Sequence, residues 1–390
     1  MSKFNVGYYE FNKDGGFNFQ LNRFYSSGIL EYDELMEIGS KVTSFEKWIE
    51  LFCELAEKSK AEGDILKTAI CYRAAQFYTL SDAVDEDGKL LKKVLYEKCR
   101  EAYDQYYSKK EELKYDRIPF EKAYLPVYYV KPEVESKSVI VIHGGYDSFV
   151  QEFFDVLLFF GEQGYEVYFF EGPGQGEVLN RCEVQMTHEW EHCTSAVLDY
   201  FDLKDVTLIG ISLGGYLATR AAAFDKRIQR LVMYDLIYDF YGSLVAKMGK
   251  KKARMFDYLI KHPKNIAWKW LEKKFNEYYF LRWLLKQGYA IYENVHTPYE
   301  YFNCIKKYNT RELSPMITQD TLVLAGAADI YTIYYQEQLD ALKNARSVTG
   351  RVFTKEENGD HHCQIGNMKL VLDTIQIWIE EKTNGQKSGT

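Results

Sequence analysis

The stretch that decides the fold is Val206–Gly215, which reads Val-Thr-Leu-Ile-Gly-Ile-Ser-Leu-Gly-Gly. Its start, Val206–Ile209, is β-branched and largely apolar, which is typical of a buried strand, whereas Tyr216–Ala223 is typical of a helix. Between them lies the pattern Gly-x-Ser-x-Gly, centred on Ser212. Such a tight turn strains the serine backbone and requires glycine on either side, because a side chain there would clash. The sequence therefore predicts a serine nucleophile at a helix N-terminus, where backbone N–H groups can stabilise an oxyanion.

Composition narrows the classes of protein that the chain can belong to. Hydrophobic residues make up 46% of the 390 residues, which is enough for a large core. The net charge of -8 argues against a nucleic-acid or anionic-membrane partner, and no apolar run approaches the length of a membrane span. Residues 1–5 lack the apolar run of a signal peptide, and the 7 cysteines are scattered without Cys-x-x-Cys pairing. We therefore expect a cytoplasmic protein with reduced thiols.

Residues 1–116 are predicted to form a helical N-terminal domain. Residues 4–24 show no firm periodicity, so we expect a loose structure there. From Tyr32 to Lys114 apolar residues recur at helical spacing, for example at Phe45, Ile49, Phe52 and Leu55. This spacing predicts three or four antiparallel helices that bury their apolar faces against one another.

Residues 117–390 are predicted to form an α/β domain with a doubly wound, mostly parallel sheet. Short, almost continuous apolar runs alternate with helical segments, as expected when helices cover both faces of a sheet. The predicted strands are 124–130, 138–142, 165–170, 206–209, 230–235, 321–324 and 348–354. An aromatic-rich helical insertion interrupts them at about 240–314. Because it follows a strand of an open sheet, we expect it to cap the edge at which such sheets bind ligands.

A serine nucleophile needs a base that takes its proton and an acid that orients the base. After a Gly-x-Ser-x-Gly turn of this kind, the acid follows the serine in the chain and the base follows the acid. Asp329 fits the acid because it follows a predicted strand, whereas Asp320 precedes that strand and Asp340 lies within a helix. Asp329 could equally cap the next helix, and the two roles are compatible. Only His361 and His362 follow, so one of them is the predicted base, and their spacing does not choose between them.

An oxyanion hole requires two backbone N–H donors. One is predicted to be Leu213, the residue after the nucleophile, and the other to come from the loop that follows an earlier strand. That loop reads His143-Gly144-Gly145. We expect Gly145 to be the donor, because a backbone that approaches the substrate oxygen closely favours the absence of a side chain.

Two other strings resemble binding motifs. His188-Glu189-Trp190-Glu191-His192 has the His-Glu-x-x-His spacing of zinc proteases on a predicted helix, 187–200. That helix connects two parallel strands and the third ligand of such sites has no counterpart, so a packed helix face is favoured. Gly172–Gly176 lacks the spacing of a dinucleotide-binding loop. The sequence therefore predicts no metal and no cofactor.

Over residues 124–382 these motifs resemble the α/β-hydrolase superfamily. The string Glu171-Gly-Pro-Gly-Gln-Gly-Glu177, the helical N-terminal region and the His362-Cys363 loop resemble a group within it. That group contains acylaminoacyl-peptidase-like enzymes and 2,6-dihydroxypseudooxynicotine hydrolases, the latter acting on C–C bonds. The resemblance implies an oxyanion hole made by Gly145 and Leu213, and a triad of Ser212, Asp329 and His362 rather than His361.

The sequence thus predicts a serine hydrolase that cleaves an ester or an acyl-peptide amide of a small to medium, largely apolar substrate. One alternative is hydrolysis of a C–C bond in a diketone-like substrate by the same triad, and another is a non-catalytic scaffold protein. The expected partners are a small-molecule or short acyl-peptide substrate, without nucleic acid or membrane, and a homodimer is one expected assembly. The substrate, the leaving group and the pathway stay open.

Overall fold

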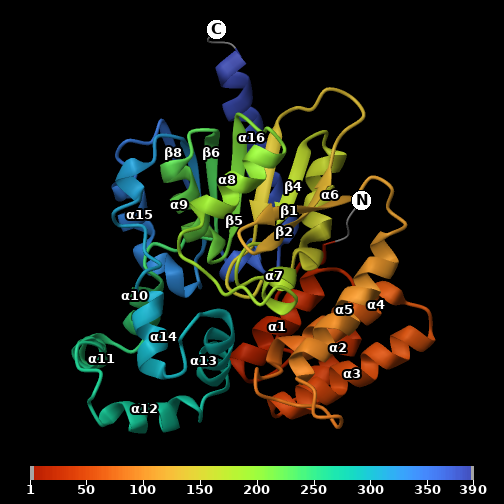
Figure 1. The fold of residues 1–390 in the computed structure, drawn as a ribbon, viewed down its shortest axis with the longest axis vertical. Coiled ribbons are helices and arrows are strands. Elements are labelled where there is room, and N and C mark those ends of the chain that lie inside the picture. Colours follow the sequence, from red (N-terminus) through yellow and green to blue (C-terminus); the bar gives the residue numbers. More distant parts are fainter. Residues whose placement is uncertain (1–3, 388–390) are drawn as a thin grey trace. The chain divides into compact units, whose positions relative to one another are not determined.

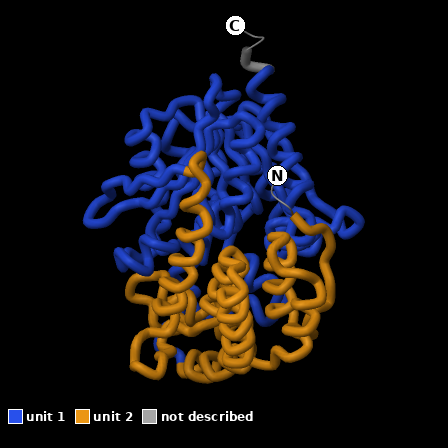
Figure 2. The backbone as a smooth tube through the Cα atoms, turned by 90° about the vertical axis from the view of Figure 1, so that its right-hand side faces the viewer, with its two compact units in different colours: residues 1–2, 114–265, 302–390 blue, residues 3–113, 266–301 orange. Residues whose placement is uncertain are grey.

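The computed structural model describes residues 4–387, so residues 1–3 and 388–390 of the two predicted domains lie outside it. The described chain divides into two compact units, drawn in blue and orange in Figure 2. The first holds residues 114–265 and the chain from Phe302 onward, and the second holds the chain up to Leu113 together with residues 266–301. Within the described residues no helix is long and apolar enough to cross a membrane.

An eight-stranded sheet in the order β1-β2-β4-β3-β5-β6-β7-β8 forms the centre of the first unit (Figure 1). β1 pairs antiparallel with β2, and β2 antiparallel with β4, whereas the remaining neighbours are parallel. The strands are β1 Lys114–Phe120, β2 Ala123–Val130, β3 Val139–His143, β4 Glu166–Phe170, β5 Val206–Ile211, β6 Ile228–Tyr234, β7 Asp320–Gly326 and β8 Ser347–Phe353. The predicted doubly wound, mostly parallel sheet is confirmed.

Helices connect the parallel strands and cover the sheet. α8 and α9 lie in front of it in Figure 1, and α16 passes behind it. The central strand β5 is buried at every position, as a strand covered on both faces must be. The helices of this unit are α6 Phe154–Glu162, α7 Gly176–Asn180, α8 Glu191–Tyr200, α9 Gly214–Phe224, α10 Phe240–Ala246, α11 Lys250–Ile260, α15 Tyr335–Ala341 and α16 Met368–Lys387.

One strand of this unit was not predicted, and one helix is shorter than predicted. β1 was not predicted, because its burial varies irregularly along an edge strand that contains Pro119, a residue that weakens a strand signal. The helix predicted over 187–200 begins only at Glu191. His188 and Glu189 therefore precede the helix, and the prediction that the whole His-Glu-x-x-His string lies on a helix, with both imidazoles on one face, is wrong.

The second unit is helical. Its first helices bury apolar faces against one another, as in α3, which Ser44 caps by accepting the N–H of Lys47 and which buries Trp48 and Phe52. The Trp48 indole donates to the carbonyl of Ala74 in α4 at 2.7 Å. The helices are α1 Gly15–Ser26, α2 Tyr32–Lys41, α3 Phe45–Ala61, α4 Ile65–Tyr78, α5 Leu91–Tyr107, α12 Ala267–Phe275 and α13 Tyr279–Ile291.

The loose structure predicted for residues 4–24 is corrected by α1. Asp14 caps this helix by accepting hydrogen bonds from the N–H groups of Gly16 and Phe17. Phe17, Leu21 and Phe24 then lie on one buried face. The cap and the spacing were both present in the sequence, but the polar residues between them concealed the period.

The insertion at about 240–314 is divided between the two units. α10 and α11 lie in the first unit and α12 and α13 in the second, while α14, Pro298–Ile305, crosses the boundary. Trp283 of α13 stacks on Phe77 of α4 at a centroid distance of 4.6 Å and donates its indole N–H to the Phe77 carbonyl at 2.9 Å. These contacts make α13 part of the helical core that begins near the N-terminus.

Candidate active site

Ser212 stands at the turn between β5 and α9 with a φ of 62°, in the left-handed region that side chains rarely adopt. A Cβ on Gly210 would lie 1.9 Å from the Gly214 carbonyl oxygen, and a Cβ on Gly214 would lie 2.9 Å from the Gly144 oxygen. Both positions therefore require glycine, and the turn exposes the Ser212 hydroxyl above the carboxyl end of the sheet.

The structure brings Ser212, His362 and Asp329 together from three separate loops. Ser212 Oγ lies 2.8 Å from His362 Nε2, and His362 Nδ1 lies 2.6 Å from Asp329 Oδ2. A carboxylate can only accept here, so Nδ1 carries a proton and Nε2 is left to accept the serine proton. This is the arrangement of a nucleophile, a base and an orienting acid.

His361, the alternative base, lies outside this chain of hydrogen bonds. Its Nε2 is 3.9 Å from Asp360 Oδ1, and burial lowers the pKa of His361 below its usual value. His362 opens a short 3₁₀ turn, His362–Gln364, whose backbone turns left-handed at Cys363 with a φ of 50°. This turn gives the two adjacent imidazoles different surroundings, and it is the His362 ring that lies against Ser212 Oγ.

The charges of the triad support one another. Burial opposes ionisation of Asp329, but the charge of His362 and the hydrogen bonds that the carboxylate accepts outweigh it and lower the pKa of Asp329. Burial also favours a neutral His362, but the charge of Asp329 outweighs it and raises the pKa of His362 well above its usual value. The pair therefore stabilises the imidazolium that forms when the serine gives up its proton.

Asp235 is a second carboxyl at this site, and sequence reasoning missed it. It directly follows β6, is fully buried, and places Oδ2 3.8 Å from His362 Nδ1. Burial, and then the charge of Asp329, raise the pKa of Asp235 well above its usual range, so this carboxyl is the one of the pair that favours its protonated form. Its signal was its position after a strand, which it shares with Asp329.

Two backbone amides adjoin the serine. A Cβ on Gly145 would lie 2.7 Å from Leu213 N, so the two residues are in close contact and position 145 must be glycine. Within residues 4–387, neither the Gly145 nor the Leu213 N–H donates a hydrogen bond to the protein. Both amides are thus available to an oxygen atom bound beside Ser212.

A series of neighbouring aromatic rings extends from His362. The Tyr331 ring lies 5.3 Å from the His362 ring, Phe240 lies 6.1 Å from Tyr331, and Tyr146 lies 6.0 Å from Phe240. Phe240 is the first residue of α10, so this part of the insertion places an aromatic ring near the triad. The surroundings of the base are consequently apolar on this side.

The glycine-rich string after β4 is held by buried carboxylates. Glu171 accepts hydrogen bonds from the N–H groups of Val150 at 2.8 Å and Glu177 at 2.7 Å. A Cβ on Gly176 would lie 1.9 Å from Glu171 Oε1, so the string wraps this carboxylate closely. These bonds fix the loop that runs from β4 to α7 beside the Gly144–Gly145 loop.

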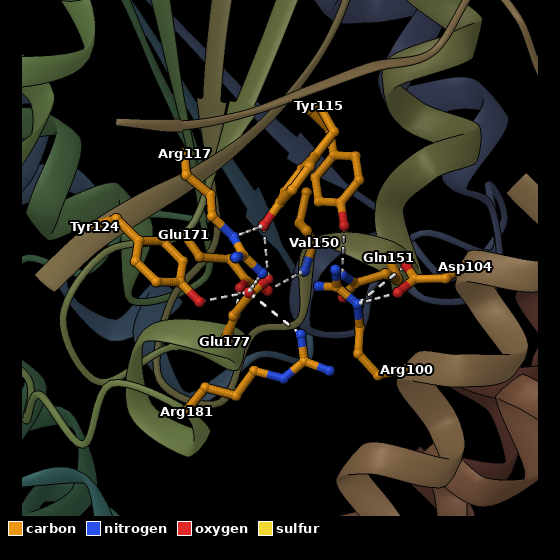
Figure 3. A network of polar contacts seen from close by, with 11 residues as sticks. Arg100, Asp104, Tyr115, Arg117, Tyr124, Val150, Gln151, Glu171, Glu177 and Arg181 are labelled. Atoms are coloured by element: carbon orange, nitrogen blue, oxygen red, sulfur yellow. Dashed lines mark hydrogen bonds and ion pairs between the residues drawn. The ribbon is translucent and has the colours of Figure 1, made fainter. Parts of the chain in front are cut away.

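The Glu177 carboxylate is fully buried and is compensated by cations and phenols (Figure 3). It accepts from Arg117 at 2.8 Å, Tyr124 at 2.7 Å, Tyr115 at 3.0 Å and Arg181 at 3.3 Å. Both arginines are partly exposed, whereas the carboxylate is not. The network therefore ties β1 and β2 to the start of α7.

One group of side chains among the described residues is close enough to share a metal ion, and it consists of Asp235, Asp329 and His362. His188 and His192 of the His-Glu-x-x-His string are not part of such a group. His362 Nδ1 and Asp329 already hydrogen-bond each other, which is the role of a triad rather than of two metal ligands.

The comparisons with known proteins concern the family and the fold of the chain. Residues 139–371 match the model of the "Alpha/beta hydrolase family". Hydrolase acrC of Aspergillus aculeatus is 30% identical over an alignment of 268 positions, with 63% of this chain and 60% of the relative covered. Hydrolyase poxO of Penicillium oxalicum is 32% identical, with 60% of this chain and 63% of the relative covered. The chain thus matches less than two thirds of the length of these two relatives.

Solved structures resemble the chain over more of its length. The 2,6-dihydroxy-pseudo-oxynicotine hydrolase superposes with a TM-score of 0.61 at 17% identity, covering 94% of this chain and 95% of the other. The wild-type AbyA5 structure gives a TM-score of 0.66 at 14% identity, covering 90% of each chain. At these identities the likeness concerns the fold, while the family match covers most of the chain. The chain therefore belongs to the alpha/beta hydrolase family.

Proposed function

We propose that the protein is a serine hydrolase that works by acyl transfer through Ser212, His362 and Asp329. The observation that carries the proposal is the unbroken run of hydrogen bonds from Ser212 Oγ through both ring nitrogens of His362 to Asp329. A hydroxyl paired in this way with an oriented imidazole is activated for attack on a carbonyl carbon once the imidazole is neutral.

In the proposed reaction, Ser212 Oγ attacks the substrate carbonyl while His362 Nε2 takes the serine proton. Asp329 stabilises the imidazolium, and the N–H groups of Gly145 and Leu213 bind the oxyanion. His362 then gives the proton to the leaving group, and an acyl-enzyme on Ser212 remains. Water, deprotonated by His362, hydrolyses this ester and frees the serine.

The proposed substrate is a small to medium, largely apolar ester or acyl-peptide amide. The rings of Tyr331, Phe240 and Tyr146 beside the base favour an apolar acyl or leaving group. The second candidate keeps the triad and changes the bond, so that a C–C bond of a diketone-like substrate is hydrolysed and His362 protonates the leaving carbon. The structural likeness to the 2,6-dihydroxy-pseudo-oxynicotine hydrolase is the reason to test such substrates.

The test is labelling of the purified protein with a fluorophosphonate probe, followed by mass spectrometry of the adduct. We expect one adduct per chain on Ser212, lost in Ser212→Ala and in His362→Ala and retained in the matched control His361→Ala. A panel of p-nitrophenyl esters, N-acyl peptides and β-diketones then separates ester, amide and C–C hydrolysis. A folded protein without any adduct on Ser212 would refute the mechanism and favour the scaffold hypothesis.

A further inference from the structure

Gln175 is a buried residue of the glycine-rich string, only 1% exposed. Its Nε2 donates to the carbonyl oxygens of Gly144 at 2.9 Å and Gly145 at 3.0 Å. Its Oε1 accepts the N–H of Gly172 at 3.1 Å. Because only the oxygen can accept from an N–H group, this third bond fixes which way the side-chain amide points. Gln175 therefore presents both amide hydrogens to the loop that carries Gly145.

His143 adds a second donor to the same carbonyl. Its Nδ1 lies 3.0 Å from Gly144 O, and only a protonated nitrogen can pair with a carbonyl oxygen. Burial lowers the pKa of His143 to about 4, so the ring is neutral with its proton on Nδ1. Its Nε2 has no hydrogen-bond partner among the described residues, and the Phe170 and Trp190 rings lie 5.4 and 5.3 Å away. Among the described residues, the hydrogen bond of the His143 imidazole is thus the one to the Gly144 carbonyl.

Because of the geometry of the peptide bond, the hydrogen bonds to the Gly144 carbonyl also constrain the oxyanion hole. In a trans peptide the C=O of one residue and the N–H of the next point in opposite directions. The Gly144–Gly145 peptide is trans, since the cis bond found in the described chain is Tyr234–Asp235. Holding Gly144 O therefore fixes the direction of the Gly145 N–H, which points the opposite way within the peptide plane, away from Gln175.

We propose that Gln175, assisted by His143, is a positioning residue that holds the Gly145 amide in the orientation needed to bind the oxyanion. The inference rests on the proposed function and deepens it. Stabilisation of an oxyanion is strongest when the donor is fixed before the reaction begins. Without Gln175, two buried carbonyls lose a donor, and the glycine peptides can rotate to find another, which carries the Gly145 N–H out of line.

The chain offers a matched control in Gln319, another buried glutamine. It is 2% exposed, donates Nε2 to the Ala222 carbonyl at 2.7 Å and accepts the N–H of Thr318 at 2.9 Å. A change to leucine at either position removes the same kinds of hydrogen bond at similar burial. A purely structural role predicts equal effects of Gln175→Leu and Gln319→Leu on the chemistry at Ser212.

The experiment measures the second-order rate of fluorophosphonate labelling on Ser212 in full-length protein, with thermal unfolding as a check on folding. Phosphonylation places a negative oxygen in the oxyanion hole and needs no knowledge of the substrate. We expect Gln175→Leu to slow labelling by about 10- to 100-fold, while Gln319→Leu stays within about threefold of wild type. Equal labelling rates for the two variants would overturn the inference.

A second variant, Gln175→Glu, keeps the size of the side chain and covers the case in which Gln175→Leu does not fold. An ionised glutamate repels the two carbonyls, whereas a protonated one can donate its single O–H to one of them, and burial raises a glutamate pKa. The labelling rate relative to wild type should therefore rise as the pH falls from about 8 to about 5. A ratio independent of pH argues against positioning, while wild-type protein that is never labelled on Ser212 refutes the proposed function instead.

Discussion

Asp235 and Asp329, which follow the neighbouring strands β6 and β7, place their carboxyl oxygens 3.8 and 2.6 Å from the same nitrogen, His362 Nδ1. Only one of two carboxyls this close can ionise readily, because two like charges repel at short distance. Asp329 holds the charge and Asp235 holds the proton. The site therefore contains one acid that orients the base and a second that supports the first.

We expect Asp235 to replace Asp329 in part when Asp329 is changed to asparagine. Loss of the triad acid lowers kcat by about 10⁴ in serine proteases. With Asp329→Asn, the Asp235 carboxyl no longer faces a negative neighbour and can ionise beside His362, so the loss should be only about 100-fold. The variant Asp235→Asn should lose less than about tenfold, and the double variant should reach the full 10⁴ or so. Equal kcat in Asp329→Asn and the double variant would show that Asp235 cannot act.

The pH dependence of kcat/KM should report the charge on His362. The imidazole must be neutral to take the serine proton, and its pKa is raised well above its usual value chiefly by Asp329, against the effect of burial. Activity should therefore rise with pH, with a midpoint above about 6.5. In the double variant Asp235→Asn/Asp329→Asn, which leaves no carboxylate beside the ring, the midpoint should move to lower pH, whereas His361→Gln should leave it unchanged. A double-variant profile that coincides with wild type contradicts the assignment.

Asp235 should also make stability depend on pH. Its pKa in the folded protein lies above that of an unfolded aspartate, so its contribution to stability is largest below about pH 4 and is lost as the pH rises. Asparagine does not titrate and can still donate a hydrogen bond to Asp329. The Tm of Asp235→Asn minus the Tm of wild type should thus become more positive as the pH rises from about 4 to about 7. A difference that shrinks over this range would show that Asp235 is ionised in the folded state.

The stacking of α13 on the N-terminal helices predicts a large effect of one tryptophan. Trp283 is 9% exposed and packs on Phe77, so Trp283→Ala should lower the free energy of unfolding of the helical unit by about 3–5 kcal/mol. Trp270 of α12 is 58% exposed, and Trp270→Ala should change it by less than about 0.5 kcal/mol. Urea unfolding followed by circular dichroism measures both. Similar losses for the two variants would mean that α13 does not belong to this core.

Much of the fold was predictable because its signals are local. Alternating apolar runs and helical segments predicted the parallel strands, and Gly210-x-Ser212-x-Gly214 predicted the turn that carries the serine. The same local view missed β1, whose edge position weakens its pattern, and α1, whose cap at Asp14 is followed by polar residues. Asp329 could be singled out from its place after a strand, whereas His362 was preferred to His361 only by resemblance.

What the sequence determined by itself is therefore the framework: a doubly wound sheet, a strained serine between two obligatory glycines, and an aspartate and two histidines that follow in order. Tertiary structure alone decided that His362 contacts Ser212, that Asp235 joins Asp329, and that Gln175 holds the Gly144–Gly145 peptide. Steric limits on the local backbone depend on consecutive residues, so they can be predicted from the sequence. Contacts between loops that are about 30 to 150 residues apart in the chain depend on how the strands align in the sheet. The spacing of residues in the sequence does not predict them.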